Sequence, residues 1–449
     1  MVIYLKNISI WEDIDKFKYP TLNKDLDVDI LIVGGGITGI SILHHLKDTY
    51  FKIALVEQNE IGRSTTGKST GKLTYLQNDL IDKIRFSFKN KKTLLYLKSQ
   101  QETINSIVNT IKDEHINCNL KKVDSYLFTN NNNQINKIKN LELFLNNNGY
   151  RTINSNLDLV KYKYQLKVTD TYIFNPIKFI YGLVKDKDYP IYEHTSIIKI
   201  KKSNDYYICK TNNNKIIKTK WVILACHYPY FIIPYFFPIK CSLEKSYLIA
   251  SKGNYHQSSI ISYSKPFISI RSDNKSLIYL SNSHKVGNKL CEKKNFNSLL
   301  KHTTIKPDYI WSNIDIITND GLPYIGEIKS KMIIATGYNT WGLTNGFLAG
   351  KIIKDIILNN KNDYIKLFNP LRINFKQIIM ALVNIIHMIF SFLKSLLYRS
   401  NRIHFCPHFG CKLVFNEVEK TWDCPCHGSR FNNEGYPISA PANKKIKQE

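Results

Sequence analysis

Near the N-terminus, two continuous hydrophobic runs flank a glycine-rich turn and an amphipathic segment. The first run, DVDILIV, covers residues 27–33; the turn GGGITG and the segment ISILHHLKD follow it, and the second run, KIALVE, covers residues 52–57. Continuous apolar runs of this length are typical of strands buried on both faces of a parallel sheet, and such strands need a crossover between them. The pattern therefore predicts a β-α-β unit over residues 27–57.

Further along the chain, WVILAC at 221–226 and KMIIAT at 331–336 have the same character and predict two more buried parallel strands. Residues 335–350, ATGYNTWGLTNGFLAG, predict a strand, a glycine turn and a helix that starts near Leu343. Asparagine-rich runs at 130–133, 146–148 and 212–214 have side chains typical of turns, so surface loops are predicted there.

The segment 377–398 has a helical pattern with an unusual distribution of polarity. Ile378 to Leu393 carry no formal charge, and the polar residues lie on one narrow stripe: Gln377, Asn384, His387, Ser391 and Lys394. The uncharged run is shorter than the ~20 residues that span a bilayer. Two interpretations stay open: a helix packed between domains or subunits, and a helix that lies on or crosses a membrane over 378–397. The flanking basic residues would suit anionic headgroups: Arg372, Lys376, Arg399 and Arg402.

The composition limits the class of protein. A chain of 449 residues, 43% of them hydrophobic, is long enough for two to three folded domains. The net charge of +27 is spread along the chain, and no basic stretch is interleaved with aromatic residues, so no nucleic-acid partner is predicted. The N-terminus lacks the pattern of a signal peptide, and a cytoplasmic protein is expected, with membrane attachment through 378–397 as the alternative. The composition predicts no oligomeric state.

Three glycines of the first turn, Gly34, Gly36 and Gly39, have the spacing G-x-G-x-x-G, and Glu57 ends the second predicted strand. In dinucleotide-binding proteins these glycines allow a tight turn, close approach of a pyrophosphate, and close helix–strand packing. The helix N-terminus favours phosphate, and an acidic residue at the position of Glu57 accepts hydrogen bonds from ribose. The pattern predicts a bound dinucleotide.

Five motifs in order resemble the D-amino-acid-oxidase/glycine-oxidase superfamily of FAD oxidoreductases: VGGGITG, STTGKSTGKLT, VILACHYPY, DGLPYIG and ATGYNTWGLTNG. The resemblance covers roughly residues 1–362 and implies bound FAD and an inserted substrate domain built on an antiparallel sheet. It also implies FAD contacts from twelve residues: Gly34, Gly36, Thr38, Gly39, Glu57, Thr66, Lys72, Thr74, Ile198, Gly337, Gly342 and Thr344. The sequence has no second G-x-G-x-x-G, which a flavin reductase fed by a nicotinamide would need.

A second group of metal-binding residue types lies near the C-terminus, in CPHFGC (406–411) and CPCHGS (424–429). Two Cys and two His could hold zinc, but each half carries a further cysteine for which a zinc site has no use. The pattern resembles a Rieske protein, in which two Cys hold one iron of a [2Fe–2S] cluster and two His hold the other. The resemblance implies four ligands, Cys406, His408, Cys424 and His427, and a disulfide between Cys411 and Cys426.

Two features depart from the Rieske pattern. A predicted helix ends only a few residues before Cys406, so the cluster domain is near-minimal and lacks supporting strands. Ser429 is present as in high-potential Rieske proteins, but Phe431 stands where these have a tyrosine. One hydrogen bond to a ligand sulfur is therefore expected to be missing, and a potential in the lower or middle part of the Rieske range is expected.

Together these features predict an α/β protein of several parts. A discontinuous Rossmann-like FAD-binding domain is assigned to 27–84, 150–228 and 316–362, and an inserted antiparallel α+β substrate or cap domain to 85–149 and 229–315. A linker helix follows at 363–400, and a small all-β Rieske domain at 401–449.

The expected reaction is hydride transfer to flavin from a C–H bond beside an amine or hydroxyl. Single electrons then pass through the cluster to an acceptor that the sequence does not identify. The resemblance suggests a small amine or amino-acid-like substrate. Arg271 could meet a substrate carboxylate, and His227, Tyr228 and Trp341 are further candidates for the cavity, with purely structural roles as the alternative. A reductase that receives electrons from a partner, and a redox-sensing or structural flavoprotein without turnover, are the other interpretations.

Overall fold

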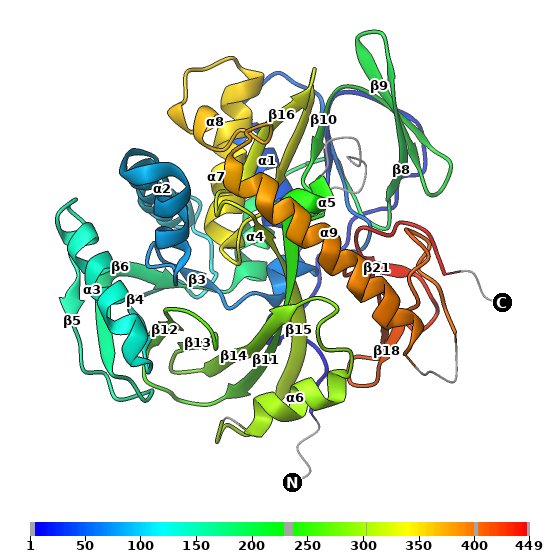
Figure 1. The fold of residues 1–449 in the computed structure, drawn as a ribbon. Coiled ribbons are helices and arrows are strands. Elements are labelled where there is room, and N and C mark those ends of the chain that lie inside the picture. Colours follow the sequence, from blue (N-terminus) through cyan, green and yellow to red (C-terminus); the bar gives the residue numbers. More distant parts are fainter. Residues whose placement is uncertain (1–4, 229–236, 302, 399–402, 447–449) are drawn as a thin grey trace.

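The computed structural model describes residues 5–228, 237–301, 303–398 and 403–446, so Arg399 and Arg402 lie outside the described residues. Its strands form three sheets (Figure 1). Short helices outside these sheets are η1 (Ile10–Glu12), η2 (Thr65–Lys68) and α5 (Phe237–Lys240).

The first sheet contains the predicted β-α-β unit and has the order β16-β17-β10-β1-β2-β7. All neighbours in this order are parallel except β16 and β17, and a hairpin of β8 and β9 extends the sheet from β10. Its strands are β1 (Leu26–Val33), β2 (Ile53–Val56), β7 (Ile191–Tyr192), β8 (Ile197–Ser203), β9 (Tyr206–Thr211), β10 (Ile216–Leu224), β16 (Tyr324–Lys329) and β17 (Met332–Thr336). Three helices pack beside it: α1 (Ile37–His45), α4 (Pro176–Val184) and α7 (Gly342–Ile357). The strands predicted at 221–226 and 331–336 and the helix predicted near Leu343 are confirmed.

The second sheet has the order β15-β11-β14-β13-β12-β4-β6-β3, with β5 added on β6, and is antiparallel except between β12 and β4. Its strands are β3 (Lys72–Leu73), β4 (Lys121–Thr129), β5 (Ile153–Asn154), β6 (Tyr164–Ile173), β11 (Cys241–Lys252), β12 (Ser258–Ser262), β13 (Ser269–Ser272), β14 (Ser276–Lys285) and β15 (Tyr309–Thr318). The helices that pack on this sheet are α3 (Asn132–Asn146) and α6 (Glu292–Lys301), whereas α2 (Leu80–Asp113) packs against α7 and α8 (Asp363–Leu367). β3 and β6 belong to this sheet, although the sequence assigns 27–84 and 150–228 to the FAD-binding domain.

The asparagine-rich runs differ from one another. The runs at 146–148 and 212–214 follow α3 and β9 as turns, as predicted. The loop predicted at 130–133 is wrong in part, because α3 begins at Asn132 and the Asn131 side chain accepts a hydrogen bond from the Asn133 N–H at 3.0 Å. Asparagine here caps a helix instead of closing a loop.

The third sheet is small and antiparallel, with strands β18 (Val414–Asn416), β19 (Thr421–Asp423), β20 (Arg430–Phe431) and β21 (Pro437–Ser439). Two helices connect the first sheet to it: α8 (Asp363–Leu367) and α9 (Phe375–Leu396). α9 runs diagonally across the molecule toward β18–β21 (Figure 1). The predicted helix at 377–398 and the all-β C-terminal region are confirmed.

Candidate functional site

A cleft with about 1900 Å³ of free space, part of it open to solvent, lies between the glycine turn, the ends of the first-sheet strands and one face of the second sheet. Nine of the twelve residues predicted to contact FAD line it: Gly34, Gly36, Thr38, Glu57, Thr66, Lys72, Gly337, Gly342 and Thr344. Gly39, Thr74 and Ile198 do not. Most of the residues predicted to contact FAD therefore lie at this cleft.

The glycine turn is shaped by close backbone approaches. Gly34 has φ +113°, and a Cβ at this position would lie 2.6 Å from the Ala225 carbonyl oxygen; a Cβ at Gly39 would lie 1.8 Å from the Gly34 carbonyl oxygen. Gly39 therefore acts in helix–strand packing under the cleft. A Cβ at Gly36 would meet only the Thr66 hydroxyl, at 3.2 Å, so this glycine keeps space in the cleft for a ligand to approach the backbone.

Glu57 is placed as a ribose ligand would be. Its carboxylate accepts hydrogen bonds from the Gly35 N–H at 2.6 Å and the Asn59 N–H at 2.9 Å, and burial raises its pKa. At the other end of the cleft, α7 begins with Gly342. The N-terminus of this 16-residue helix carries a partial positive charge, which would stabilise negative charge on a flavin bound in the cleft.

Two buried polar atoms in the cleft have no hydrogen-bond partner among the described residues: Trp341 Nε1 and His227 Nε2. Burial lowers the pKa of His227 to about 4, so its imidazole is neutral, and its ring hydrogen-bonds to the Ile314 backbone. Buried polar atoms are rarely left unpaired, so these two indicate a bound ligand. The cleft residues fit FAD.

The other sequence candidates do not line the cleft. Arg271 is buried and held internally: its Nη atoms donate to Asp273 at 3.1 Å and Ser276 at 3.0 Å, the guanidinium stacks over the Trp11 ring at 4.9 Å, and its Nε has no partner among the described residues. Tyr228 is buried in the hydrophobic cluster that contains Cys241.

The second-sheet wall of the cleft carries two acidic residues that the sequence reasoning missed. Glu244 on β11 and Asp315 on β15 are directly opposite each other and both line the cleft. Asp315 is half-buried at the cleft, and desolvation together with the charge of Glu244 raises its pKa to about 7. Asn313 donates to Asp315 at 3.2 Å, and the Lys265 ammonium lies 3.6 Å from Glu244. Acidic residues at alternating positions within apolar strands, as in SNIDII, were the available signal.

Lys72 on β3 also lines the cleft, and its amine points toward strands β12 and β13 of the same sheet. It donates to the Ile260 carbonyl and to the Ser269 hydroxyl, both at 2.7 Å. Burial and the nearby Arg271 lower its pKa well below the ordinary value.

The four predicted cluster ligands converge in the third sheet. The Cys406 and Cys424 thiols are hydrogen-bonded, which lowers the pKa of Cys406 to about 7, and the ring centroids of His408 and His427 are 5.2 Å apart. His427 Nδ1 is buried and has no partner in the described part of the chain. Two thiols and two neutral imidazoles with a free ring nitrogen fit a [2Fe–2S] cluster.

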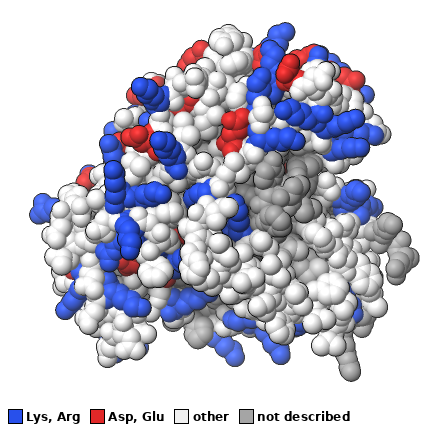
Figure 2. Space-filling view, turned by 45° about the horizontal axis from the view of Figure 1, so that its top comes forward, with Lys and Arg blue, Asp and Glu red and all other residues white. Residues whose placement is uncertain are grey.

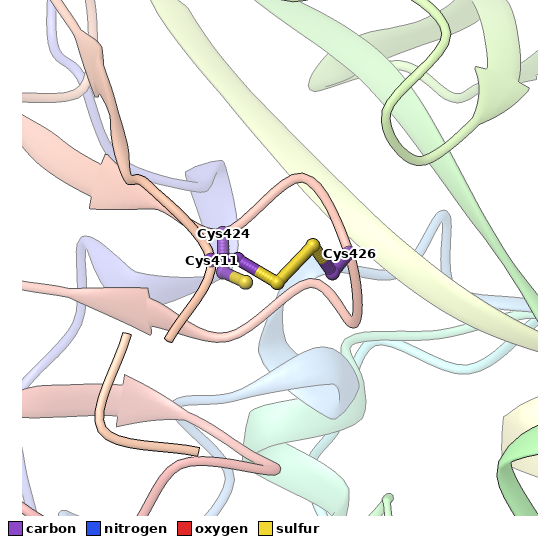
Figure 3. A group of neighbouring side chains, drawn as sticks. All are labelled: Cys411, Cys424 and Cys426. Carbon is purple, nitrogen blue, oxygen red and sulfur yellow. A yellow bond between two sulfur atoms is a disulfide. The ribbon is translucent and has the colours of Figure 1, made fainter. Parts of the chain in front are cut away.

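The predicted disulfide between Cys411 and Cys426 is confirmed. Figure 3 shows its two sulfur atoms beside the thiol of Cys424, and one ligand atom from each of the three residues lies within 4.8 Å of the others. The disulfide joins the two predicted ligand loops and leaves the Cys424 thiol free, so Cys424 stays the predicted ligand.

One buried ion pair, Lys245–Asp423, attaches the third sheet to the second, and neighbouring pairs on each side extend it into a network. Lys245 on β11 lies 2.7 Å from Asp423 and 3.1 Å from Glu292, and Arg430 lies 2.8 Å from Glu419 and 3.1 Å from Asp423. Burial alone would lower the pKa of Lys245, but Asp423 and Glu292 outweigh it and raise that pKa. The positive charges of Arg430 and Lys245 hold the pKa of Asp423 below its ordinary value in spite of burial.

The cluster loop and the cleft lie on opposite faces of the β11–β15 pair. Glu244 and Asp315 face the cleft, whereas a Cβ on Gly428, next to His427, would lie 3.2 Å from Leu243 and 3.3 Å from Ile314. Successive strand residues point to opposite faces. One layer of sheet therefore separates the two sites, and His227 bridges part of it through its hydrogen bond to Ile314.

Known proteins share both parts of this architecture. The family of FAD dependent oxidoreductases matches residues 29–356, and the Rieske [2Fe-2S] domain matches residues 402–448. YhfW of Bacillus subtilis (strain 168), described as a Rieske 2Fe-2S iron-sulfur protein, is 27% identical over 96% of this chain and 95% of its own length. Glycine oxidase from Geobacillus kaustophilus has a TM-score of 0.64 at 16% identity, covering 78% of this chain and 100% of that chain. L-amino acid deaminase from Proteus vulgaris has a TM-score of 0.63 at 16% identity, and the match covers 80% of this chain and 97% of that chain.

The fold, the cleft and the convergent ligands agree with these matches. The chain therefore belongs to the family of FAD-dependent oxidoreductases related to D-amino-acid oxidase, and it carries a C-terminal Rieske [2Fe–2S] domain.

Proposed function

We propose that this enzyme oxidises a small amine bound against Glu244 and Asp315, and that the electrons leave through the Rieske cluster. The observation that carries the substrate class is the acidic pair on the cleft wall, which would attract an ammonium group. Lys265 already places an ammonium 3.6 Å from Glu244. A carboxylate substrate would be repelled there, and Arg271 is held by Asp273.

When bound, FAD accepts a hydride from a C–H bond beside the substrate nitrogen, and the cluster accepts single electrons. The protein's own part begins with deprotonation, because an ammonium cannot donate hydride readily. Asp315, with its pKa near 7, accepts that proton at a carboxylate oxygen, while Glu244 holds the positive charge before the transfer. Trp341 Nε1 and His227 Nε2 supply polar contacts that orient the bound molecules.

Two observations favour electron exit through the cluster. The cluster loop and the cleft are separated by a single sheet layer, on the order of 10 Å. The Lys245–Asp423 ion pair, which docks the third sheet, would hold this separation constant. We place the enzyme in the cytoplasm and leave its final electron acceptor unnamed.

Anaerobic flavin bleaching by amines, amino acids, hydroxy acids and NADH tests the proposal. Amines should bleach the flavin, and the reduced cluster should then appear by electron paramagnetic resonance. Bleaching by NADH alone would support a reductase, and no bleaching by any compound would support a redox-sensing or structural role.

The acidic pair has its own test. Asp315→Asn should lower kcat/KM for amines at least about tenfold and remove a rise in kcat/KM through pH 7, because protonated Asp315 cannot accept a proton. Asp205→Asn, an exposed turn substitution, is the matched control. An unchanged pH profile in Asp315→Asn would exclude the assigned role.

A further inference from the structure

α9 is oriented opposite to an ordinary surface helix. The buried positions of α9 are all polar: Gln377, Asn384, Ser391 and Ser395. Its large apolar side chains are exposed instead, with 54% of Ile386, 55% of Ile389 and 66% of Phe390 accessible. A surface helix of a globular protein normally buries its apolar stripe. The outward face of α9 therefore suits an apolar environment outside the molecule.

The inward polar stripe is held by specific hydrogen bonds. Gln377 donates to Asp320 at 2.5 Å and to the Tyr324 hydroxyl at 3.0 Å. Asn384 donates to the Cys241 carbonyl at 3.1 Å and to Asn319 at 3.0 Å. Rotating α9 about its axis would break these hydrogen bonds and leave buried polar groups unpaired, so the fold determines which side of α9 faces outward.

The exposed apolar face extends beyond the helix. It includes Ile378, Ile379, Leu382, Val383, Ile386, Ile389, Phe390, Leu393 and Leu396 on α9, and Leu371, Ile373 and Phe375 at its N-terminal side. Figure 2 shows a broad area without charged side chains over α9, with Lys and Arg at its margins. Soluble monomers rarely expose a continuous apolar area of this extent, and such areas mark protein or membrane contacts.

The charges beside this face favour an anionic partner. α9 contains no Asp or Glu. Three neighbouring lysines donate to neutral oxygens: Lys376 to Ser87 at 3.1 Å, Lys285 to Asn384 at 2.9 Å, and Lys394 to the Asn288 carbonyl at 2.6 Å. None of the three has a carboxylate partner within the described residues. The charges of Lys376 and Lys394 can attract lipid phosphate, as in helices that lie in the membrane interface, whereas Lys285 is held against the buried Asn384.

The attachment points decide how such a helix meets a bilayer. Bonds at Gln377, Asn384 and Lys394 hold α9 along a length of about 25 Å. A helix held along its whole side cannot cross a membrane alone. We propose that α9 lies in the plane of an anionic bilayer and docks the enzyme there with the face described above.

This placement has a consequence for the cluster. His427 Nε2 lies 3.1 Å from Met388 Sδ of α9, and the ring of Phe409, which is 53% exposed, is 5.4 Å from that of His427. The histidine edge of the cluster site is therefore at the border of the apolar face. Docking would bring this edge to the membrane interface.

Flotation of the full-length holoprotein with lipid vesicles tests the proposal. It should float with vesicles of phosphatidylcholine and phosphatidylglycerol, bind pure phosphatidylcholine more weakly, and lose part of the binding in high salt. The double variant Leu382→Gln/Phe390→Gln should bind at least about tenfold more weakly. Leu143→Gln removes a similarly exposed apolar side chain from α3 and should bind like the wild type. Flavin and cluster absorbance verify that the variants are folded.

A reporter variant makes the test independent of affinity. The tryptophan of Phe390→Trp should be quenched by brominated acyl chains, and that of Leu143→Trp should not. Absence of vesicle binding by the wild type would overturn the proposal, as would full binding by the double variant. A stable dimer that leaves vesicles unbound would instead identify the face as an interface between copies and would also overturn it.

Discussion

The two cofactor sites are built in opposite ways. The dinucleotide turn is held mainly by its own backbone and by the end of the neighbouring strand β10. Gly39 packs on Gly34, and Gly34 packs on Ala225, which follows β10. The Rieske domain has four strands of two or three residues each, and one of its buried charges, Asp423, pairs with the neighbouring sheet. Lys245 in that sheet carries the link to Asp423.

The difference follows from size. A segment of this length buries too little apolar surface to be stable alone, and small domains rely on metals, disulfides or neighbours. Here the Cys411–Cys426 disulfide, the cluster ligands and the buried ion pairs serve together. The glycine turn lies in the core of a much larger sheet and needs none of them.

The largest expected effect concerns the turn. Gly39→Ala would place a methyl group 1.8 Å from a backbone oxygen that cannot move away, so we expect loss of soluble protein. Gly36→Ala meets only the Thr66 hydroxyl at 3.2 Å and should keep the fold while losing FAD. Expression yield, circular dichroism and flavin content measure both. A Gly39→Ala protein that is stable and yellow would contradict this account of the turn.

The second prediction concerns the cluster. Cys424→Ser should contain no iron or sulfide and keep FAD, because it removes a ligand from the smaller domain only. Cys426→Ser removes the disulfide and should hold a cluster that is lost faster. Iron and sulfide analysis of aerobically prepared protein measures both. One zinc and no sulfide in the wild type would show that the cysteines form a zinc site.

The third prediction tests the dependence of the Rieske domain on its neighbour. Lys245→Met removes the ammonium that pairs with the buried carboxylates Asp423 and Glu292. The packing of the Rieske domain against the second sheet should weaken by about 3 kcal/mol. Cluster absorbance should then disappear at lower denaturant concentration than flavin absorbance. Lys122→Met breaks an exposed pair with Asp170 and should change neither. Simultaneous loss of both signals in Lys245→Met would show that the two parts unfold as one.

The same ion pairs predict a pH dependence. The pKa of Asp423 is lower in the folded protein than in the unfolded chain, so its contribution is present above about pH 4 and is lost as the pH falls. The cluster of the wild type should therefore be released in acid before the flavin. Parallel acid titrations of the two absorbance bands measure this order. Release of flavin first would contradict it.

The smallest expected effect is on the reduction potential. The Ser429 hydroxyl hydrogen-bonds to Cys406, and a donor to a ligand sulfur stabilises the reduced state. Ser429→Ala should lower the potential by about 60 mV. Phe431→Tyr should raise it if the new phenol reaches a ligand sulfur. A redox titration measures both, and an unchanged potential in Ser429→Ala with an intact cluster would contradict the assigned bond.

The features that the sequence predicts well are encoded by local spacing. G-x-G-x-x-G, CPHFGC and CPCHGS each place their residues within a single turn or loop, so position in the chain gives position in space. Glu244 and Asp315 meet only through the register of β11 and β15, which the pattern of one strand does not contain. Arg271 lies outside the cleft and pairs with Asp273, which its alternation with apolar residues along the strand does not indicate. The sequence shows the polar stripe of α9, but it does not show that the protein buries this polar side and exposes the apolar side.

The last strand of the protein takes part in building the first cofactor site. Ile438, Ser439 and Ala440 line the same cleft as the glycine turn, and Gln58 donates to the Pro437 carbonyl at 2.8 Å. The cleft is thus complete only after nearly the whole chain has left the ribosome. Truncation before residue 437 yields a chain whose cleft lacks the wall formed by Ile438, Ser439 and Ala440.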